Sequence, residues 1–227
     1  MISAIVPAAG CGSRMGSPIN KQFLMLKGKP ILARTLLALE ACTSIDEIIV
    51  VASKDEIEYC HRTVIKPFGL KKVTRVVAGG LERQDSVANG LSVTHKEADI
   101  ILIHDGARPF VTQKILLDTI SHARTYGAAG VAVRVKDTIK IVGEHGFISD
   151  TPPRDELWAM QTPQAFKAEL LIAAYERAIS DGFRGTDDSM LVERLGHKVK
   201  IVEGSYENIK ITTPDDLMLG ELILERV

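Results

Sequence analysis

Short apolar runs alternate with amphipathic runs along most of the chain. The apolar runs predict strands at Ser3–Pro7, Glu47–Ala52, Thr74–Ala78, Ile100–His104, Gly130–Arg134 and Lys198–Glu203. The amphipathic runs predict helices at Ile31–Ala41, Lys54–Ile65, Arg83–Thr94, Gln113–Tyr126, Pro163–Ser180, Asp187–Leu195 and Pro214–Val227. Because such alternation is typical of βαβ units, it predicts an α/β fold with a mostly parallel, twisted sheet flanked by helices.

Several predicted helices begin with residues that suit a helix start. Residues 53–56 and 213–216 match the capping-box pattern, and Pro214 stands at the first helical position. Thr162, followed by proline, predicts the start of another helix. Thr186 predicts the N-cap of the helix that follows it, although a helix start also receives phosphate well.

One region departs from the alternation. Residues 137–142 and 147–150 flank a turn at 143–146, a pattern that predicts a β-hairpin. Its strands are too short and too polar on one face to form a core of their own. The hairpin either lies on its own domain or reaches a partner subunit. With no repeat, low-complexity segment or linker in the sequence, residues 1–227 are predicted to form a single domain.

Composition excludes several classes of partner. The chain has 227 residues, of which 45% are hydrophobic, and 28 basic residues face 29 acidic ones. A net charge of −1 argues against a general nucleic-acid surface, so any anion site must be local. No apolar run approaches the ~18 residues of a membrane helix, and no leader pattern precedes the first strand. The three cysteines lack metal-ligand spacing, and we therefore expect a protein of the reducing cytoplasm. Because no run is long enough for a membrane helix, we expect no membrane partner.

The first strand runs directly into a loop of small residues. Backbone N–H groups can approach an anion closely there, because few side chains stand in the way. Arg14 lies in this loop, and Lys21 follows seven positions later. Two cations beside such a loop indicate bound phosphate whose charge increases during a reaction. The small residues at issue are Pro7, Ala8, Ala9, Gly10 and Gly12.

Other phosphate loops fit less well. The Walker pattern needs Gly-Lys-Ser/Thr at the helix start, and the sequence does not supply it. The dinucleotide fingerprint needs its third glycine where Met15 stands, with Gly16 one position late, so only a looser dinucleotide loop stays open. A glycine-rich turn without a ligand would leave Arg14 and Lys21 unexplained.

Polar residues also follow later strands. Asp105 follows the apolar run 100–104, where ligands bind in open α/β sheets, and could meet a sugar hydroxyl or a metal. Arg108 could meet a phosphate; the alternative is an Asp-Gly turn with a solvent-facing arginine. His104 is predicted to pack beside the strand rather than to act in catalysis.

Gly79 and Gly80 allow close approach to a flat ligand such as a base, whose edge Ser86 could contact. Nearby, Arg83 and Asp85 could instead pair with one another. Lys210 lies between two isoleucines and is either partly buried and aimed at an anion or simply solvated.

Taken in order, these segments closely resemble one family, the 2-C-methyl-D-erythritol 4-phosphate cytidylyltransferases of the non-mevalonate isoprenoid pathway. The matching pieces are Pro7-Ala8-Ala9-Gly10-x-Gly12-x-Arg14-Met15, Lys21-Gln22-Phe23, Gly79-Gly80-x-Glu82-Arg83-x-Asp85-Ser86-Val87, His104-Asp105-x-Ala107-Arg108-Pro109, Asp137-Thr138, Arg154-x-x-Leu157-Trp158, Gln161-Thr162-Pro163-Gln164, Thr186-Asp187 and Glu203-Gly204-x-x-x-Asn208-Ile209-Lys210-x-Thr212. They cover nearly the whole chain. Gly106, which stands where alanine is frequent, and Phe23, where tyrosine occurs, are mild departures that touch none of the proposed charges.

The resemblance implies a Rossmann-like nucleotidyltransferase fold, similar to glycosyltransferase-A folds, with a protruding β-hairpin arm. It also implies that CTP and methylerythritol phosphate react to give the CDP-linked alcohol and pyrophosphate, with Mg²⁺ held mainly through the CTP phosphates and no metal ligand assigned in the chain. The catalytic residues it implies are Arg14, Lys21, Arg154 and Lys210. The nucleotide-binding residues are Pro7, Ala8, Ala9, Gly10, Gly12, Gly80, Ser86, Asp105 and Gly106. The substrate-binding residues are Asp105, Arg108, Thr138, Arg154, Thr186 and Lys210.

The resemblance further implies that residues 137–157 form a dimerisation arm, which brings Thr138 and Arg154 into the partner's site. The active site would then be shared across a homodimer. A ribitol-5-phosphate cytidylyltransferase is the nearest alternative, although that relative tends towards Ala-Gly-Gly where this chain has Ala8-Ala9-Gly10. A nucleotide-binding module without turnover is the alternative from another class.

Overall fold

The structure is a computed structural model of the chain that describes residues 1–10 and 20–226. The strands are β1 Ile2–Pro7, β2 Met25–Leu26, β3 Lys29–Pro30, β4 Glu47–Ala52, β5 Val73–Ala78, β6 Ile100–Ile103, β7 Ala128–Arg134, β8 Ile141–Val142, β9 Ile148–Asp150, β10 Trp158–Lys167 and β11 Lys200–Glu203. The α-helices are α1 Ile31–Glu40, α2 Ile57–Cys60, α3 Arg83–Leu91, α4 Gln113–Tyr126, α5 Ala168–Ser180, α6 Asp188–Arg194 and α7 Pro214–Glu225. Short 3-10 or π turns are η2 Lys21–Phe23, η3 Lys54–Glu56, η4 His61–Ile65, η5 Glu144–Gly146 and η6 Arg154–Glu156.

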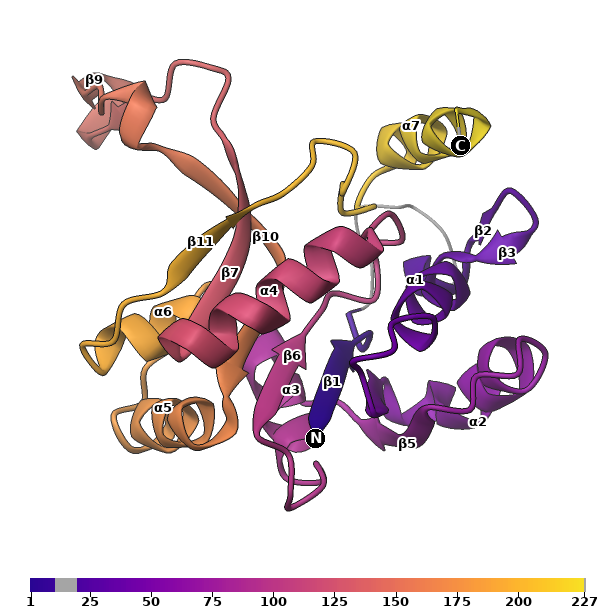
Figure 1. Cartoon of the computed structure of the whole chain (residues 1–227). Coiled ribbons are helices and arrows are strands. Elements are labelled where there is room, and N and C mark those ends of the chain that lie inside the picture. Colours follow the sequence, from indigo (N-terminus) through magenta and orange to yellow (C-terminus); the bar gives the residue numbers. More distant parts are fainter. Residues whose placement is uncertain (11–19, 227) are drawn as a thin grey trace.

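Seven strands form the central sheet, in the order β11-β7-β10-β6-β1-β4-β5 (Figure 1). Every neighbouring pair is parallel except those that involve β10, which runs antiparallel to both β6 and β7. This arrangement confirms the prediction of a mostly parallel sheet flanked by helices. Parallel strands need helical crossovers, which is why helices cover both faces.

The two faces of the sheet bury alternate residues of the same strands. One face, through residues such as Val6 and Leu102, packs against α1, α2 and α4. The other face, through Ile5 and Ile103, packs against α3, α5 and α6. Side chains alternate across a strand, so a strand buried on both faces becomes a continuous apolar run. This explains why β1, β4 and β6 could be located from the sequence.

The prediction for residues 163–167 was wrong, because they continue a strand instead of starting a helix. Within β10, Gln164 lies opposite Ile103 of β6 and Gly130 of β7, and α5 begins only at Ala168. The apolar pattern missed this strand because it carries buried polar side chains. Gln164, for example, donates from its amide to Asp187 Oδ2 (2.8 Å) and is 1% exposed. Hydrogen bonds of this kind offset the loss of water.

The predicted helix starts have mixed outcomes. The capping box of α7 is confirmed, with Thr213 accepting from Asp216 N–H and Asp216 accepting from Thr213 N–H. The box at Ser53 was wrong, since Ser53 Oγ donates to the carbonyl oxygen of Ala9 instead (3.0 Å). For α6, the N-cap is Asp187 rather than Thr186. The helix predicted over 54–65 is divided into η3, α2 and η4.

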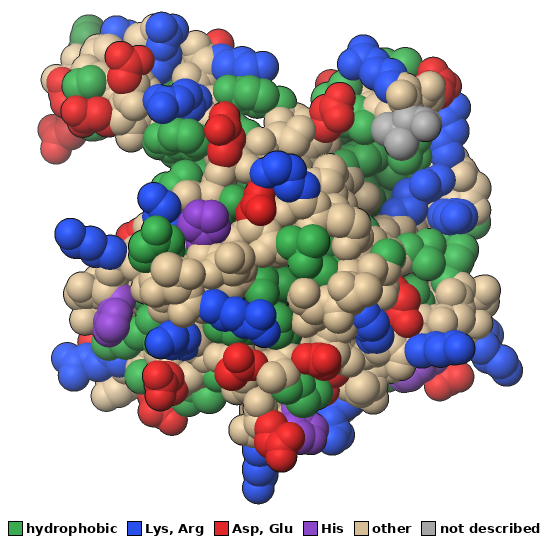
Figure 2. Space-filling view, in the orientation of Figure 1, with side chains coloured by type: hydrophobic (Ala, Val, Ile, Leu, Met, Phe, Trp, Pro, Cys, Tyr) green, Lys and Arg blue, Asp and Glu red, His purple; other side chains and the backbone are tan. Residues whose placement is uncertain are grey.

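The hairpin predicted between residues 137 and 150 is present, although its strands are shorter than expected. Strands β8 and β9 pair antiparallel, with Ile141 opposite Asp150. They belong to the arm, residues 137–157, which lies in the connection that leaves the main sheet at the end of β7 and returns at the start of β10. Figures 1 and 2 show the arm as a lobe projecting from the body, separated by an open notch from the lobe that contains α7.

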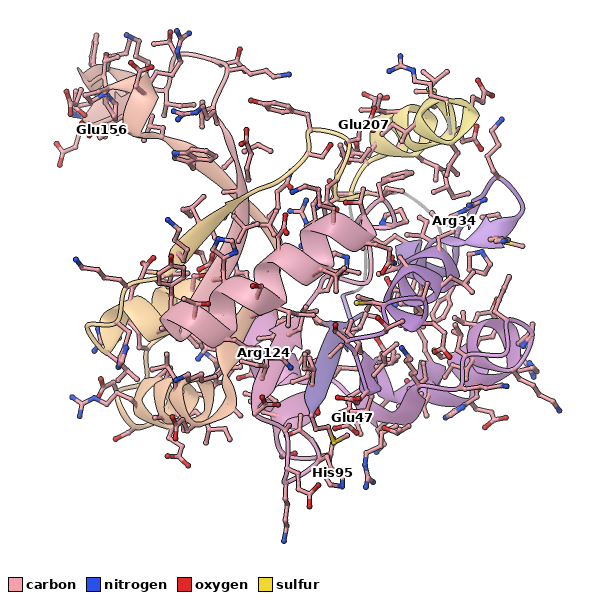
Figure 3. All side chains as sticks on the ribbon, in the orientation of Figure 1. Arg34, Glu47, His95, Arg124, Glu156 and Glu207 are labelled. Carbon is pink, nitrogen blue, oxygen red and sulfur yellow. The ribbon has the colours of Figure 1, made fainter. Side chains whose placement is uncertain are left out.

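Polar contacts fasten the connections around the sheet. Arg34 on α1 donates to the carbonyl oxygens of Leu26 and Lys27 (2.7 and 2.8 Å), which holds the β2–β3 hairpin (Figure 3). The buried Glu47 carboxylate accepts from the backbone N–H of His95 (2.8 Å).

Among the described residues, no helix has both the length and the apolar character needed to cross a membrane.

Helix α3 approaches β1 so closely that Gly90 leaves no room for a side chain. A Cβ at Gly90 would lie 2.6 Å from Ile5 Cγ2 and 3.2 Å from Val51 Cγ2. Glycine in a helix is ordinarily less favourable than alanine. Here we expect Gly90→Ala to lower the free energy of unfolding by about 1–3 kcal/mol, because the methyl group overpacks the interface. Urea unfolding checks this. Ser92→Ala at the exposed C-cap of the same helix should change stability by less than about 0.5 kcal/mol, and a stabilising Gly90→Ala would contradict the packing argument.

Candidate active site

A cleft of about 240 Å³ opens at the carboxyl ends of β1, β5 and β6. Loops that follow parallel strands meet at this edge of a sheet, where ligands of open α/β folds bind. The residues that line the cleft are Pro7, Ala8, Ala9, Gly10, Lys21, Gln22, Gly80, Leu81, Glu82, Arg83, Ser86, Asp105, Ala107 and Lys210. Small residues therefore form one part of this lining, and charged side chains form another.

The small-residue wall is held by hydrogen bonds to its backbone. The N–H of Ala8 donates to the carbonyl oxygen of Val51 (2.7 Å), and the Gln22 side-chain amide donates to the carbonyl oxygen of Ala8. Ser53 holds Ala9 in the same way. Lys21 lines the cleft at the start of η2, whereas Gly12 and Arg14 lie outside the described residues. The wall thus presents backbone groups at fixed positions, beside one of the predicted cations.

Gly80, which lines the cleft, belongs to a glycine pair that follows β5. Gly79 packs so tightly that a Cβ there would lie 2.4 Å from Ala9 Cβ. The N–H of Gly80 donates to Ser86 Oγ, and Ser86 Oγ donates to the carbonyl oxygen of Glu82, both at 3.1 Å. The Ser86 hydroxyl therefore donates its hydrogen bond to the protein's own backbone and holds the loop against α3.

Asp105 is the centre of the charged side. Its Oδ1 lies 3.1 Å from Arg83 Nε, and its Oδ2 lies 2.8 Å from Lys210 Nζ and 3.8 Å from Arg108 Nε. Burial alone would raise the pKa of this carboxyl, but Arg83, Lys210 and Arg108 hold that pKa well below its usual range. Asp105 is accordingly an anion at neutral pH and holds three cations around one point.

Arg83 pairs across the cleft rather than along its own helix. The suggested pair with Asp85 was wrong, because Asp85 accepts from Glu82 N–H and from Arg184. Arg83 instead reaches Asp105 and the buried Asp188. Burial alone would lower the pKa of Arg83, but the carboxylates of Asp188 and Asp105 raise it above its usual value. Its guanidinium is therefore a permanent cation.

Arg108 and His104 support the loop after β6. Arg108 Nη1 donates to the carbonyl oxygen of Asn208 (2.8 Å), and its side chain is only 12% exposed, so it is not a solvent-facing arginine. Burial lowers its pKa. His104 is fully buried, with Nε2 3.0 Å from the carbonyl oxygen of Arg108, and burial lowers its pKa to about 4. It is thus a neutral packing residue, as predicted.

Lys210 is positioned by contacts of the residues that follow it in the chain. The N–H of Ile211 donates to the carbonyl oxygen of Ala107 (2.9 Å), and the Ile211 side chain is fully buried. Asp216 Oδ2 accepts from the N–H groups of Thr212 (2.8 Å) and Thr213 (2.9 Å). The start of α7 therefore fixes the backbone that carries Lys210.

Some residues implied by the resemblance do not line the cleft of their own chain. Thr138 and Arg154 lie exposed on the arm, where Figure 3 labels nearby Glu156, and Arg154 Nη1 donates to the carbonyl oxygen of Lys136 (3.3 Å). Thr186 is exposed just before α6. Gly106 is buried, and a Cβ there would meet Leu32 Cδ1 at 3.0 Å. It packs behind Ala8 and Pro7 of the small-residue wall and does not itself line the cleft.

The sequence also left Arg83 and Leu81 without a place in the site, although both line the cleft. A leucine that is 98% exposed at a cleft cannot be recognised from its neighbours in sequence.

No group of three or more His, Cys, Asp or Glu side chains that could hold a metal ion occurs among residues 1–10 and 20–226.

The family model for 2-C-methyl-D-erythritol 4-phosphate cytidylyltransferase (IspD) matches residues 2–226. The chain belongs to this family. Among its curated members, the cytidylyltransferase of Clostridium novyi is 53% identical over 224 residues, covering 99% of this chain and 96% of the relative. That of Caldanaerobacter subterraneus is 52% identical and covers 99% of both chains. The family assignment therefore rests on the whole length of the chain.

A solved structure of the family is closely similar. The crystal structure of 4-diphosphocytidyl-2C-methyl-D-erythritol synthase from Anaerococcus prevotii superposes with a TM-score of 0.88 at 37% identity, covering 99% of this chain and 96% of that one. The family's fold and the fold described above are therefore the same.

Asp216 allows the anchoring of the Lys210 segment to be tested by pH. Burial works to raise its pKa, but the hydrogen bonds from Thr212 and Thr213 lower it below its usual value. Because the folded-state pKa lies below the unfolded one, Asp216 stabilises the fold at neutral pH and loses this effect as the pH falls from about 4, the unfolded value, through the lower folded-state pKa. We expect Asp216→Asn to lower the free energy of unfolding by about 1 kcal/mol at pH 7, as for a helix cap half exposed to solvent. The deficit should shrink at pH 3, measured by urea unfolding. Asp215→Asn, at an exposed neighbour, is the control, and a deficit independent of pH would contradict the charge argument.

Proposed function

We propose that this chain transfers the cytidylyl group of CTP to 2-C-methyl-D-erythritol 4-phosphate, releasing pyrophosphate. The observation that carries the proposal is the composition of the cleft, which is lined by a wall of backbone groups, by Lys21 and by the cationic cluster around Asp105 and Lys210. Two phosphate-bearing molecules can be held there side by side. The names of the full-length relatives support this choice of substrates.

The reaction needs little proton chemistry. An oxygen of the methylerythritol phosphate attacks the α-phosphorus of CTP, and the bond from that phosphorus to the oxygen bridging it to the β-phosphorus breaks in line. Because the attacking phosphate is already ionised, no general base is required. Catalysis then consists of positioning and of stabilising the negative charge that develops on the transferred and leaving groups.

The nucleotide would lie along the small-residue wall. Pro7, Ala8, Ala9 and Gly10 present backbone groups to CTP, and Gly80, with its loop fixed by Ser86, borders the base. Gly12 and Gly106 belong to the same proposed subsite, although Gly106 would act through the loop it supports because it does not line the cleft. Arg14 and Lys21 would stabilise the charge on the α-phosphate and on pyrophosphate.

The methylerythritol phosphate would lie on the charged side. Lys210 and Arg154 would hold its phosphate for attack, with Arg108, Thr138 and Thr186 contributing to binding and Asp105 contacting hydroxyls. Among the described residues, Arg83, Arg108 and Lys210 form ion pairs with the carboxylates of Asp105 and Asp188, so this network holds three cations and two anions. The excess positive charge suits an incoming phosphate.

Mg²⁺ is proposed as the cofactor, held mainly through the CTP phosphates. The described residues offer no cluster of metal-binding side chains, and the Asp105 carboxylate already contacts three cations. The chain's own groups thus fit a metal carried in by the nucleotide better than a resident ion. Its chemistry would be to neutralise phosphate charge.

The exposed arm supports a homodimer with shared sites, in which residues 137–157 act as the dimerisation arm of a single 1–227 domain. Four of its apolar side chains, Ile141, Val142, Phe147 and Ile148, are 49%, 59%, 76% and 62% exposed. Their burial against a second copy would also remove Thr138 and Arg154 from solvent and bring them towards the partner's cleft. A cytoplasmic location without nucleic-acid or membrane partners completes the proposal.

Alternative functions have less support. Curated full-length relatives are named for methylerythritol phosphate, so a ribitol-5-phosphate cytidylyltransferase is not favoured. A binding module without turnover is disfavoured because the cleft keeps Lys21 and Lys210 together with the cationic cluster.

Pyrophosphate release tests the proposed reaction directly. With CTP and Mg²⁺, we expect release with methylerythritol phosphate and little with ribitol 5-phosphate. Lys21→Ala and Arg14→Ala should each lower kcat by about 10²–10³-fold, since each removes a charge that stabilises the transition state. Lys29→Ala, at an exposed lysine of β3, is the control that should retain full activity. Release with ribitol 5-phosphate alone, or near-normal turnover in both variants, would contradict the proposal.

A shared site can be tested by mixing two inactive subunits. In a dimer of one Lys21→Ala chain and one Arg154→Ala chain, one site carries both substitutions and the other carries neither, if Arg154 serves the partner's cleft. We therefore expect co-expressed, doubly tagged heterodimers to regain about half of the activity of the unsubstituted enzyme. If Arg154 served its own chain, every site would keep one lesion and activity would stay absent. Sedimentation should show a dimer throughout.

A further inference from the structure

Arg83 bridges two carboxylates that lie on different sides of it. Its Nε lies 3.1 Å from Asp105 Oδ1 at the cleft, and its Nη2 lies 2.7 Å from Asp188 Oδ2 in α6. A planar guanidinium presents its donors in a fixed fork and can hold two such groups at once. Arg83 therefore connects the cleft to the interior behind it.

Asp188 is committed to this connection. It is 1% exposed, its Oδ2 takes the Arg83 bond, and its Oδ1 accepts a hydrogen bond from the hydroxyl of Tyr175 (2.6 Å). With both oxygens engaged and no access to solvent, Asp188 has no capacity left for a substrate. A buried carboxylate is tolerated only when it is paired and hydrogen-bonded, and Arg83 and Tyr175 meet that need.

Tyr175 is the inner end of the chain of contacts. It is 3% exposed on α5 and packs in the apolar cluster that includes Leu171 and Val192. Burial and the adjacent Asp188 raise the pKa of its hydroxyl, so it stays a proton donor. Because the ring is held by packing, the hydroxyl has a fixed position from which it orients Asp188.

The outer end of the chain of contacts is Lys210. Arg83 occupies Oδ1 of Asp105, and this leaves Oδ2 facing Lys210 Nζ at 2.8 Å. If Arg83 were not held by Asp188, it could turn to take both oxygens of Asp105 and displace Lys210. The position of the lysine at the cleft is thus set in part by Asp188 and Tyr175, which do not line the cleft.

We propose that Tyr175, Asp188 and Arg83 are positioning residues, which orient the Asp105 carboxylate so that its Oδ2 holds Lys210 in place for the methylerythritol phosphate. This inference rests on the proposed function, in which Lys210 holds that phosphate. Tyr175 and Asp188 act through Arg83. None of the three is required to touch the CTP phosphates.

Tyr175→Phe tests the proposal most gently, because it removes one hydroxyl and keeps the packed ring. We expect kcat/KM for methylerythritol phosphate to fall about fivefold, as for one lost hydrogen bond, while the dissociation constant for CTP, measured by calorimetry, stays within about twofold. Tyr126→Phe, at a tyrosine that is 56% exposed, is the matched control and should change neither. A loss of general stability would weaken both substrates alike, so the split between them separates positioning from a merely structural role.

A double-mutant cycle shows whether Tyr175 acts through Arg83. In an Arg83→Met background, Tyr175→Phe should cause no further loss in kcat/KM, because the group it orients is already gone. Asp188→Asn provides a second background if Arg83→Met does not fold. Equal losses in the substituted and unsubstituted backgrounds, or an equal loss of CTP affinity, would overturn the inference. An unsubstituted enzyme that releases no pyrophosphate would instead overturn the proposed function, and the inference with it.

Discussion

The Asp105 carboxylate is buried at the end of a central strand, and the arrangement of charge around the cleft follows from the need to stabilise it there. Three cations from three parts of the chain converge on it. Each of them has a second attachment, to Asp188, to the carbonyl oxygen of Asn208, or through the backbone that leads to α7. One buried anion therefore ties α3, α6, the loop after β6 and the C-terminal helix to the same edge of the sheet.

Much of the fold was predictable because a parallel strand that is buried on both faces has a continuous run of apolar residues in its sequence. Strands β1, β4 and β6 are of this kind. Strand β10 was not predictable, since its buried Gln161, Thr162 and Gln164 are polar and are compensated by partners distant in sequence. The spacing of apolar residues indicates which side chains are buried away from water. It does not indicate which polar side chains are buried and hydrogen-bonded inside the protein.

The same limit applies to the site. The small-residue loop, Lys21, Asp105 and Lys210 could be found because each stands beside a strand end or an apolar flank. Arg83 could not be placed, because its partners Asp105 and Asp188 lie 22 and 105 residues away in sequence. Its neighbour Asp85 suggested a local pair that the fold does not use. Whether a charged residue pairs locally or across the fold depends on how the elements pack, and the sequence shows only its near neighbours.

The root of the arm has a consequence for how this fold can vary. The arm leaves β7 after Arg134 and enters β10 at Trp158, and these two residues are directly opposite each other in the antiparallel ladder, with the Arg134 guanidinium carbon 4.7 Å from the Trp158 ring centroid. Tyr206 donates to the carbonyl oxygen of Arg134 at the same place (2.7 Å). The cross-strand pair of Arg134 and Trp158 thus joins β7 to β10 at the point where the chain leaves the sheet for the arm and returns from it. Lengthening, shortening or reshaping the arm would leave the register of the main sheet intact. The main sheet is therefore closed independently of the arm, and the arm can change shape for assembly only as far as Thr138 and Arg154 keep their proposed place in the partner's cleft.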